Sequence, residues 1–179
     1  MTWGRLDTAQ AEALAAVVRG RTIHDLGCGD QVLSDALVQL GAAAVIAVDE
    51  HPVGCPGSWV NTVRTTFAEY ETRQPIIDVA FVSWPVNHNE PPLLDLLYRA
   101  KTIAYLGKCT DGTLCGWPGL FRYFLGLELV AHVPHPANTL LIYGTPVAAP
   151  RVGEWEERAG LDHRFSYPYF GSVPFKVTL

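Results

Sequence analysis

The sequence is short of positive charge and of long apolar runs. It has 13 lysines and arginines against 18 acidic residues, a formal net charge of −5, and only three of the basic residues are lysines. Nucleic-acid binding relies on clustered Lys and Arg that neutralise phosphates, so a large DNA or RNA footprint is not expected. The longest clean apolar run, residues 42–48, is far shorter than a membrane span.

No basic start followed by an apolar block is found at the N-terminus, where Asp7 and Glu12 come early. This pattern predicts no secretory signal, and we interpret the chain as cytoplasmic, without a membrane partner. Apolar residues make up 49% of the 179 residues, enough to bury the core of one domain. We expect an N-terminal helix at residues 1–20, a core at 21–146 and an aromatic C-terminal extension at 147–179.

Cysteine is also scarce, with four residues in the chain and no CxxC pair of the kind that marks a strong zinc signature. Cys109 and Cys115 flank a short loop, and His132 and His135 form an HxxH pair in which His135 lies between two prolines. In a chain that can bury a full core, cysteines are expected as free thiols. We therefore expect no disulfide framework and no metal site.

Apolar periodicity and turn residues predict strands that alternate with helices. Strands are predicted at residues 22–26, 43–50, 63–71, 76–85 and 101–107, helices at 7–20, 34–41, 91–100 and 118–126, and a hairpin at 127–144. This order predicts an α/β fold with a doubly wound, mostly parallel sheet, to which the hairpin adds an antiparallel strand. Ligands bind such sheets at the carboxyl ends of the strands, near the switch in strand order.

The first predicted strand runs into a glycine loop with the sequence DLGCGD, residues 25–30. Gly27 and Gly29 allow a tight turn and a close approach of the backbone to a ligand. The second predicted strand ends in Asp49 and Glu50, with Asp49 twenty residues after Gly29. An acid at that place can accept both hydroxyls of a ribose. The combination predicts a site for an adenosine-type nucleoside.

The charges of the loop favour one ligand of this type. A dinucleotide fingerprint requires a third glycine where this chain has Val32. Asp25 and Asp30 add negative charge beside the glycines, which suits a cationic amino group and a sulfonium better than a pyrophosphate. We therefore predict S-adenosylmethionine (SAM) as the cofactor, with an NAD-dependent oxidoreductase as the less favoured alternative.

The stretch HDLGCGDQ resembles the first motif of the class I SAM-dependent methyltransferases, hydrophobic-Asp/Glu-x-Gly-x-Gly-x-Gly. The resemblance extends over roughly residues 20 to 146 and implies a Rossmann-like, seven-stranded sheet whose last strand is antiparallel. By position, Gly27, Cys28 and Gly29 would line the methionine part of SAM. Asp25 would lie near its amino group, and Asp49 would hold the ribose.

Four more residues complete the predicted cofactor site. Asp30 and Glu50 adjoin the acids already named, and Phe67 and Glu69 would flank the adenine. Gln31 occupies the position of the family's third glycine, and we expect it to add a side chain beside the ligand.

The fourth predicted strand ends in SWPVNHN, residues 83–89, and in the same family this strand end faces the transferred methyl. Amino-methylating members carry Asp/Asn/Ser-Pro-Pro-aromatic there, which Ser83, Trp84 and Pro85 match in part. The serine hydroxyl and main-chain carbonyls would orient an acceptor, the indole would stabilise a sulfonium by cation–π attraction, and His88 would accept the proton. The alternatives are a core tryptophan and a loop histidine.

These residues together predict a SAM-dependent methyltransferase that acts on an N or O acceptor. The acceptor would belong to a small molecule first, or to an exposed group of a macromolecule. A non-catalytic SAM-binding sensor or partner subunit is the alternative, and the aromatic extension would then offer a contact, including one between copies of the chain. The SWP stretch followed by the TDGT loop also resembles a subgroup of methyltransferase-like proteins, a likeness that names no acceptor.

Overall fold

The computed structural model describes residues 6–73, 76–85, 91–108 and 115–144. Helices and strands alternate as the sequence predicts. The strands are β1 (Thr22–Leu26), β2 (Ala44–Asp49), β3 (Val60–Arg64), β4 (Ile77–Ser83), β5 (Ala100–Gly107), β6 (Glu128–Pro134) and β7 (Thr139–Gly144). The helices are α1 (Thr8–Val18), α2 (Val32–Gln39), α3 (Phe67–Glu71), α4 (Pro91–Tyr98) and α5 (Pro118–Leu125).

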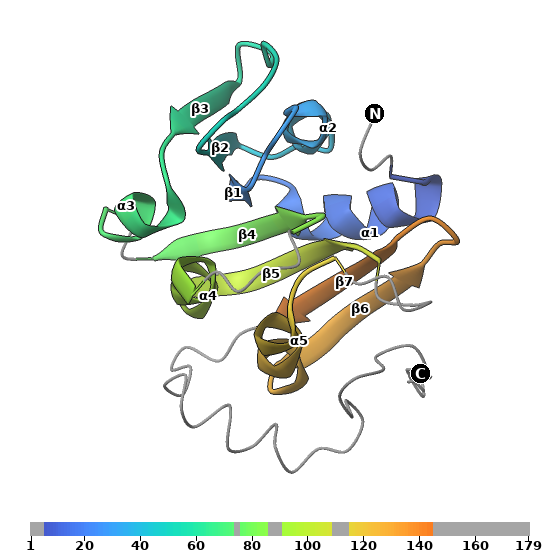
Figure 1. Cartoon of the computed structure of the whole chain (residues 1–179). Coiled ribbons are helices and arrows are strands. Elements are labelled where there is room, and N and C mark those ends of the chain that lie inside the picture. Colours follow the sequence, from blue (N-terminus) through green and yellow to red (C-terminus); the bar gives the residue numbers. More distant parts are fainter. Residues whose placement is uncertain (1–5, 74–75, 86–90, 109–114, 145–179) are drawn as a thin grey trace.

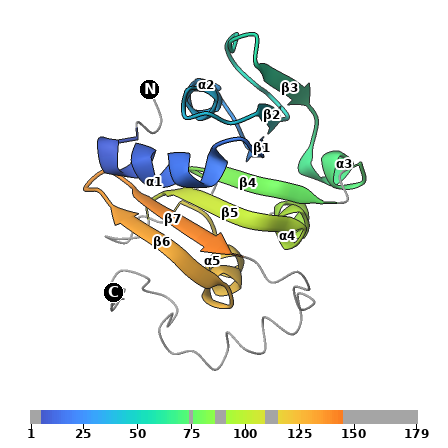
Figure 2. The ribbon, with the colours of Figure 1, turned by 180° about the vertical axis from the view of Figure 1, so that it is seen from behind.

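The seven strands form one sheet in the order β3-β2-β1-β4-β5-β7-β6. The first five strands along the chain pair in parallel, and β7 runs antiparallel between β5 and β6. Strands β3 and β6 lie at opposite edges (Figures 1 and 2). This confirms the predicted α/β sheet with a C-terminal antiparallel hairpin strand. The strand order reverses between β1 and β4, which is where such sheets bind ligands.

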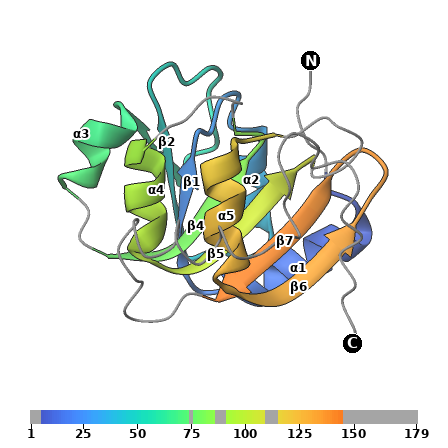
Figure 3. The ribbon, with the colours of Figure 1, turned by 60° about the horizontal axis from the view of Figure 1, so that its bottom comes forward.

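Helices cover both faces of the sheet, with α4 and α5 on one side and α1 and α2 on the other (Figure 3). Leu14 of α1 and Leu37 of α2 are fully buried in one apolar cluster, and Leu97 of α4 and Phe121 of α5 belong to the second. Burial on both faces explains why β2 and β4 are mostly apolar. No helix in the described part of the chain is long and apolar enough to cross a membrane.

The first helix begins at a capping box. The Asp7 carboxylate accepts a hydrogen bond from the Gln10 N–H at 2.7 Å, and the Gln10 side chain accepts one from the Asp7 N–H at 3.2 Å. Gln10 is fully buried and also donates to Asn138 Oδ1 at 2.8 Å. Its carboxamide thereby joins α1 to the turn between β6 and β7.

The prediction for residues 63–71 was wrong in its second half. Strand β3 begins earlier, at Val60, and ends at Arg64, whereas Phe67–Glu71 form the short helix α3. Thr66 caps this helix, since its hydroxyl accepts a hydrogen bond from the Glu69 N–H at 3.2 Å. The cap and the burial of Tyr70 outweigh the preference of threonine and aromatic residues for strands.

Candidate functional site

A cavity of about 680 Å³ opens at the carboxyl ends of β1, β2, β3 and β4, within the size range of small-ligand pockets. Seven residues predicted from the sequence line it: Gly27, Asp49, Glu50, Phe67, Ser83, Trp84 and Pro85. The other lining residues are Leu26, His51, Thr65, Thr66, Ala68, Pro91, Pro92 and Leu93. The structure therefore brings predicted cofactor and acceptor residues around one cavity.

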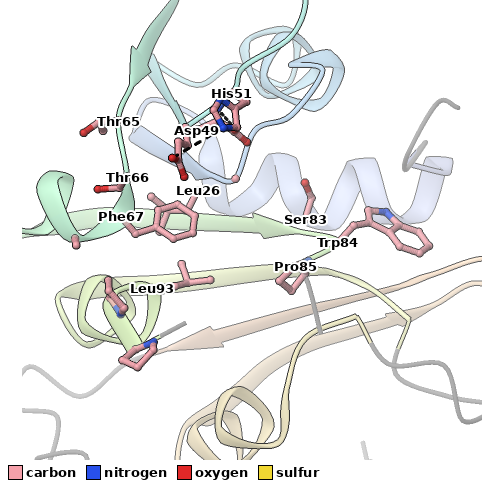
Figure 4. A pocket seen from close by; sticks show the side chains of 15 residues that line it. Leu26, Asp49, His51, Thr65, Thr66, Phe67, Ser83, Trp84, Pro85 and Leu93 are labelled. Atoms are coloured by element: carbon pink, nitrogen blue, oxygen red, sulfur yellow. Dashed lines mark hydrogen bonds and ion pairs between the residues drawn. The ribbon is translucent and has the colours of Figure 1, made fainter. Parts of the chain in front are cut away.

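The two groups of predicted residues lie at different ends of this cavity. Figure 4 shows Thr66 and Phe67 on one side and Ser83, Trp84 and Pro85 on the other. The Trp84 indole extends away from Phe67, and Trp84 has a positive φ of 49°, a backbone conformation that bulky residues rarely adopt. A nucleoside and a methyl acceptor can therefore occupy separate parts of one space.

Asp49 ties the end of β2 to the glycine loop. Its Oδ2 accepts a hydrogen bond from the Gly29 N–H at 3.0 Å, and its Oδ1 accepts one from the His51 N–H at 2.7 Å. Gly27 has a φ of +83°, and a Cβ atom there would lie 3.7 Å from the Phe67 ring. The turn thus passes close to the residues at the adenine side of the predicted site.

Asp25 is fully buried behind the glycine loop and does not itself line the cavity. Its Oδ2 accepts a hydrogen bond from Ser34 Oγ at 2.5 Å, and its Oδ1 has no hydrogen-bond partner. Loss of hydration raises the pKa of Asp25 to about 7; the Ser34 hydrogen bond opposes this shift, and the Asp49 and Asp30 charges add to it. An unpartnered carboxylate oxygen among acids favours a cation nearby.

Four other predicted cofactor residues lie outside the lining: Cys28, Gly29, Asp30 and Glu69. Cys28 is 6% exposed, and its burial, reinforced by the Asp25 charge, raises the pKa of its thiol to about 12. Asp30 accepts a hydrogen bond from the Val32 N–H at 3.2 Å. Glu69 accepts one from Thr65 Oγ1 at 2.7 Å. The predicted base, His88, falls outside the described residues.

The expectation that Gln31 adds a side chain beside the ligand needs correction. Gln31 is 2% exposed and absent from the cavity lining. Its carboxamide accepts a hydrogen bond from Thr62 Oγ1 at 2.5 Å and donates one to the Val53 carbonyl at 3.3 Å. The side chain therefore points toward β3 and the segment that precedes it.

A buried hydrogen bond that the sequence analysis missed supports the end of the cavity that Thr66 and Phe67 line. The Tyr70 hydroxyl of α3 lies 2.8 Å from Nδ1 of His24 in the middle of β1, and both side chains are buried. Burial lowers the pKa of His24, although the Asp78 charge opposes that shift. The pair fixes α3, and Phe67 at its start, against the central strand.

Sequence reasoning also missed His51, Thr65 and Thr66 as lining residues. Thr65 and Thr66 directly follow β3, so a correct end for that strand would have found them. His51 lies two residues after the end of β2, so the expectation that ligands bind at the carboxyl ends of the strands also points to it.

Of the residues weighed for a zinc site, His135 has a structural role in a turn. His135 lies in the turn after β6, where its Nδ1 accepts a hydrogen bond from the Ala137 N–H at 3.1 Å. Cys109 falls outside the described residues. Across the described ranges, no group of three His, Cys, Asp or Glu side chains is placed to hold a metal ion.

The parallel sheet with its antiparallel β7, and the glycine loop joined to an acid at the end of β2, agree with the fold implied by the resemblance to class I SAM-dependent methyltransferases. Solved methyltransferases share it. An rRNA methylase from Streptococcus thermophilus matches with a TM-score of 0.53 at 12% identity, over 81% of this chain and 98% of that one. The 23S rRNA methyltransferase ErmE matches with a TM-score of 0.52 at 14% identity, and the match covers 89% of this chain and 78% of the ErmE chain.

Curated sequences add a shorter likeness. A ribosomal protein L11 methyltransferase from Aliivibrio salmonicida is 40% identical over 53 residues, which are 30% of this chain and 18% of that protein. The chain thus spans less than a fifth of the length of this relative. No protein-family model matches the chain.

Proposed function

We propose that this protein is a SAM-dependent methyltransferase. The proposal rests chiefly on the acidic surroundings of the glycine loop. Asp25 presents a buried, unpartnered carboxylate oxygen, and Asp49 lies in the cavity wall and hydrogen-bonds to Gly29. A ligand with a ribose at one end and positive charge at the other suits both acids, since Asp49 can contact the ribose and the buried Asp25 can attract the positive charge without touching it.

The residues around the cavity fit the parts of SAM. Asp49 would accept the ribose hydroxyls, Thr66 and Phe67 would flank the adenine, and Gly27 would leave room for the methionine part. Asp25, through its unpartnered oxygen, would attract the ammonium group. When bound, SAM would supply a methyl group on a positively charged sulfur; an N or O nucleophile would attack the methyl carbon in line, and the sulfur would leave as the neutral thioether of S-adenosylhomocysteine.

The chain's own contribution to catalysis is placement. Ser83 would orient the acceptor by hydrogen bonding, and the ring of Pro85, at the same end of the cavity, would limit the motion of the acceptor. Trp84 bounds the same end of the cavity. His88 keeps its predicted role as the group that receives the departing proton.

The start of α2 argues against the NAD alternative. A pyrophosphate site needs free N–H groups at a helix N-terminus. Here the Gln31 N–H donates to the Cys28 carbonyl at 2.9 Å, and the Val32 N–H donates to the Asp30 carboxylate at 3.2 Å. An acid thus occupies the place where a phosphate would bind.

The cavity lining indicates which kind of acceptor group can enter. The described lining contains acids but no lysine or arginine, so the pocket itself would take an uncharged or cationic group. The names of the similar proteins refer to rRNA and to a ribosomal protein, which does not favour a small molecule over a macromolecule. We propose that the acceptor is a single N or O group that enters the pocket. This group can belong to a small molecule or be exposed on a macromolecule.

Calorimetric titration of the full chain with SAM, S-adenosylhomocysteine and NAD tests the cofactor. We expect micromolar binding of the two adenosyl ligands and none of NAD. Transfer of a labelled methyl group to RNA, ribosomal proteins and small amines and alcohols then tests the acceptor. Binding of both adenosyl ligands without transfer to any acceptor would favour the non-catalytic sensor, and binding of NAD alone would overturn the proposal.

A further inference from the structure

Gln31 stands where the family motif has its third glycine, and its backbone is in the left-handed conformation. Its φ is 62° and its ψ is 8°, and its side chain is 2% exposed. A residue with a Cβ atom adopts this conformation at a cost that glycine avoids. The buried side chain must therefore make contacts that offset the cost.

Both the oxygen and the nitrogen of the Gln31 carboxamide form hydrogen bonds. Its Oε1 accepts a hydrogen bond from Thr62 Oγ1, on β3, and its Nε2 donates to the carbonyl of Val53, in the connection between β2 and β3. One side chain at the start of α2 thus reaches two points on the far side of the glycine loop.

The connection between β2 and β3, residues 50–59, is here called the strap. It lies against the glycine loop at further points: the Val53 N–H donates to the Gly29 carbonyl at 2.8 Å, and a Cβ at Gly54 would lie 3.1 Å from the Asp30 carbonyl. On α2, the Asp35 carboxylate accepts a hydrogen bond from the Gly57 N–H at 2.8 Å.

The strap buries few apolar side chains of its own, since Val53 is 64% exposed and Trp59 is 77% exposed. Hydrogen bonds rather than packing therefore determine its position. Its first two residues, Glu50 and His51, line the cavity beside Asp49.

We propose that Gln31 is a positioning residue for the cofactor: its carboxamide holds the strap on the glycine loop, so that Glu50, His51 and the Asp49 carboxylate are already in place when the ligand arrives. The proposal rests on the proposed SAM site. Ordering a loop before binding removes an entropic cost from the binding step, so the gain appears in affinity.

Substitutions at both ends of the contact test this role. Gln31→Ala removes the side chain, Gln31→Gly also removes the backbone strain, and Thr62→Val removes one hydrogen bond without touching the loop. Gln39→Ala, an exposed position at the other end of α2, is the matched control. Calorimetry gives the Kd for SAM and S-adenosylhomocysteine well below the unfolding temperature, and hydrogen exchange reports the opening of residues 50–59.

We expect Gln31→Ala and Gln31→Gly to raise both Kd values by about tenfold, the equivalent of one or two lost hydrogen bonds. Exchange in the strap should rise in both variants. Thr62→Val should give a smaller increase in Kd, and adding it to Gln31→Ala should change nothing further, because the contact is already gone. Gln39→Ala should bind as the wild type does.

Two outcomes separate this role from its alternatives. If the Gln31 variants unfold at lower temperature but bind both ligands with the wild-type Kd, Gln31 is only structural, and the positioning role is overturned while the SAM site stands. If the wild-type protein binds neither adenosyl ligand, the proposed function fails and this inference fails with it.

Discussion

The Oδ2 atom of Asp49 lies 3.0 Å from the backbone nitrogen of Gly29, which donates a hydrogen bond to it across a separation of twenty residues in the chain. Strands β1 and β2 are parallel neighbours, with Leu26 opposite Val48, so their carboxyl ends meet at one edge. The acid thereby holds the glycine loop and remains in the cavity wall, where a ribose can reach it.

Replacing Asp49 with alanine should weaken SAM binding by roughly tenfold or more, since a hydrogen bond to a charged group contributes about 1.5 to 3 kcal/mol. The loop also loses an anchor, which adds to the effect. Calorimetry on the folded variant measures the change in Kd. Asp49→Asn keeps the size of the side chain but removes its charge, so it shows how much of the change comes from the charge. An unaltered Kd in Asp49→Ala would show that the ribose does not bind there.

Affinity for SAM should depend on pH through Asp25. Burial raises the pKa of this carboxyl to about 7, and an ammonium group binds the ionised form. We therefore expect the Kd to rise as the pH falls below about 7, by up to about tenfold per pH unit. Asp25→Asn should bind weakly at every pH. A Kd that stays flat between about pH 6 and pH 8 would contradict the role of Asp25.

The same group should affect the stability of the ligand-free protein in the opposite direction. A raised pKa means that the folded state holds the proton more tightly than the unfolded chain does. The stabilisation from Asp25 is complete below 3.8, the ordinary pKa of an aspartate side chain, and is lost as the pH rises through about 7. Urea denaturation should show less pH dependence over this window in Asp25→Asn than in the wild type, and equal slopes would refute the assignment.

Tyr70→Phe should destabilise the fold by about 1 to 3 kcal/mol, because the buried Nδ1 of His24 loses its partner. Chemical denaturation measures this change. Since the contact supports α3 and Phe67 lies at the start of that helix, we also expect weaker SAM binding in the folded variant. A variant as stable as the wild type would mean that water replaces the hydroxyl.

Thiol reactivity should separate Cys28 from Cys55. Cys28 is buried and its pKa is raised to about 12, whereas Cys55 is exposed in the strap. Thiolate is the reactive form, so iodoacetamide should label Cys55 in the native protein and leave Cys28 unmodified until the chain is denatured. Peptide mass spectrometry distinguishes the two, and native labelling of Cys28 would show that the glycine loop opens in solution.

Much of this arrangement could be predicted because it depends on local pattern. The mostly apolar segments at β2 and β4, the glycines after β1 and the acid at the end of β2 follow from the requirements of a buried parallel sheet and a tight turn. The capping box that begins α1 is likewise local, because Asp7 and Gln10 are three residues apart. These features need only neighbours in sequence.

The sequence by itself determined the class of fold, the edge of the sheet that holds the cavity, and Asp49 as one of its wall residues. The helix at residues 67–71 depends on tertiary structure, because the Tyr70 hydroxyl forms a buried hydrogen bond with His24 of β1, far away in the sequence. Tertiary structure also decided where Gln31 points. Thr62 and the Val53 carbonyl lie far from Gln31 along the chain and meet it only once β3 pairs with β2. Hydrogen bonds between distant residues exist only in the folded chain, so no local pattern predicts them.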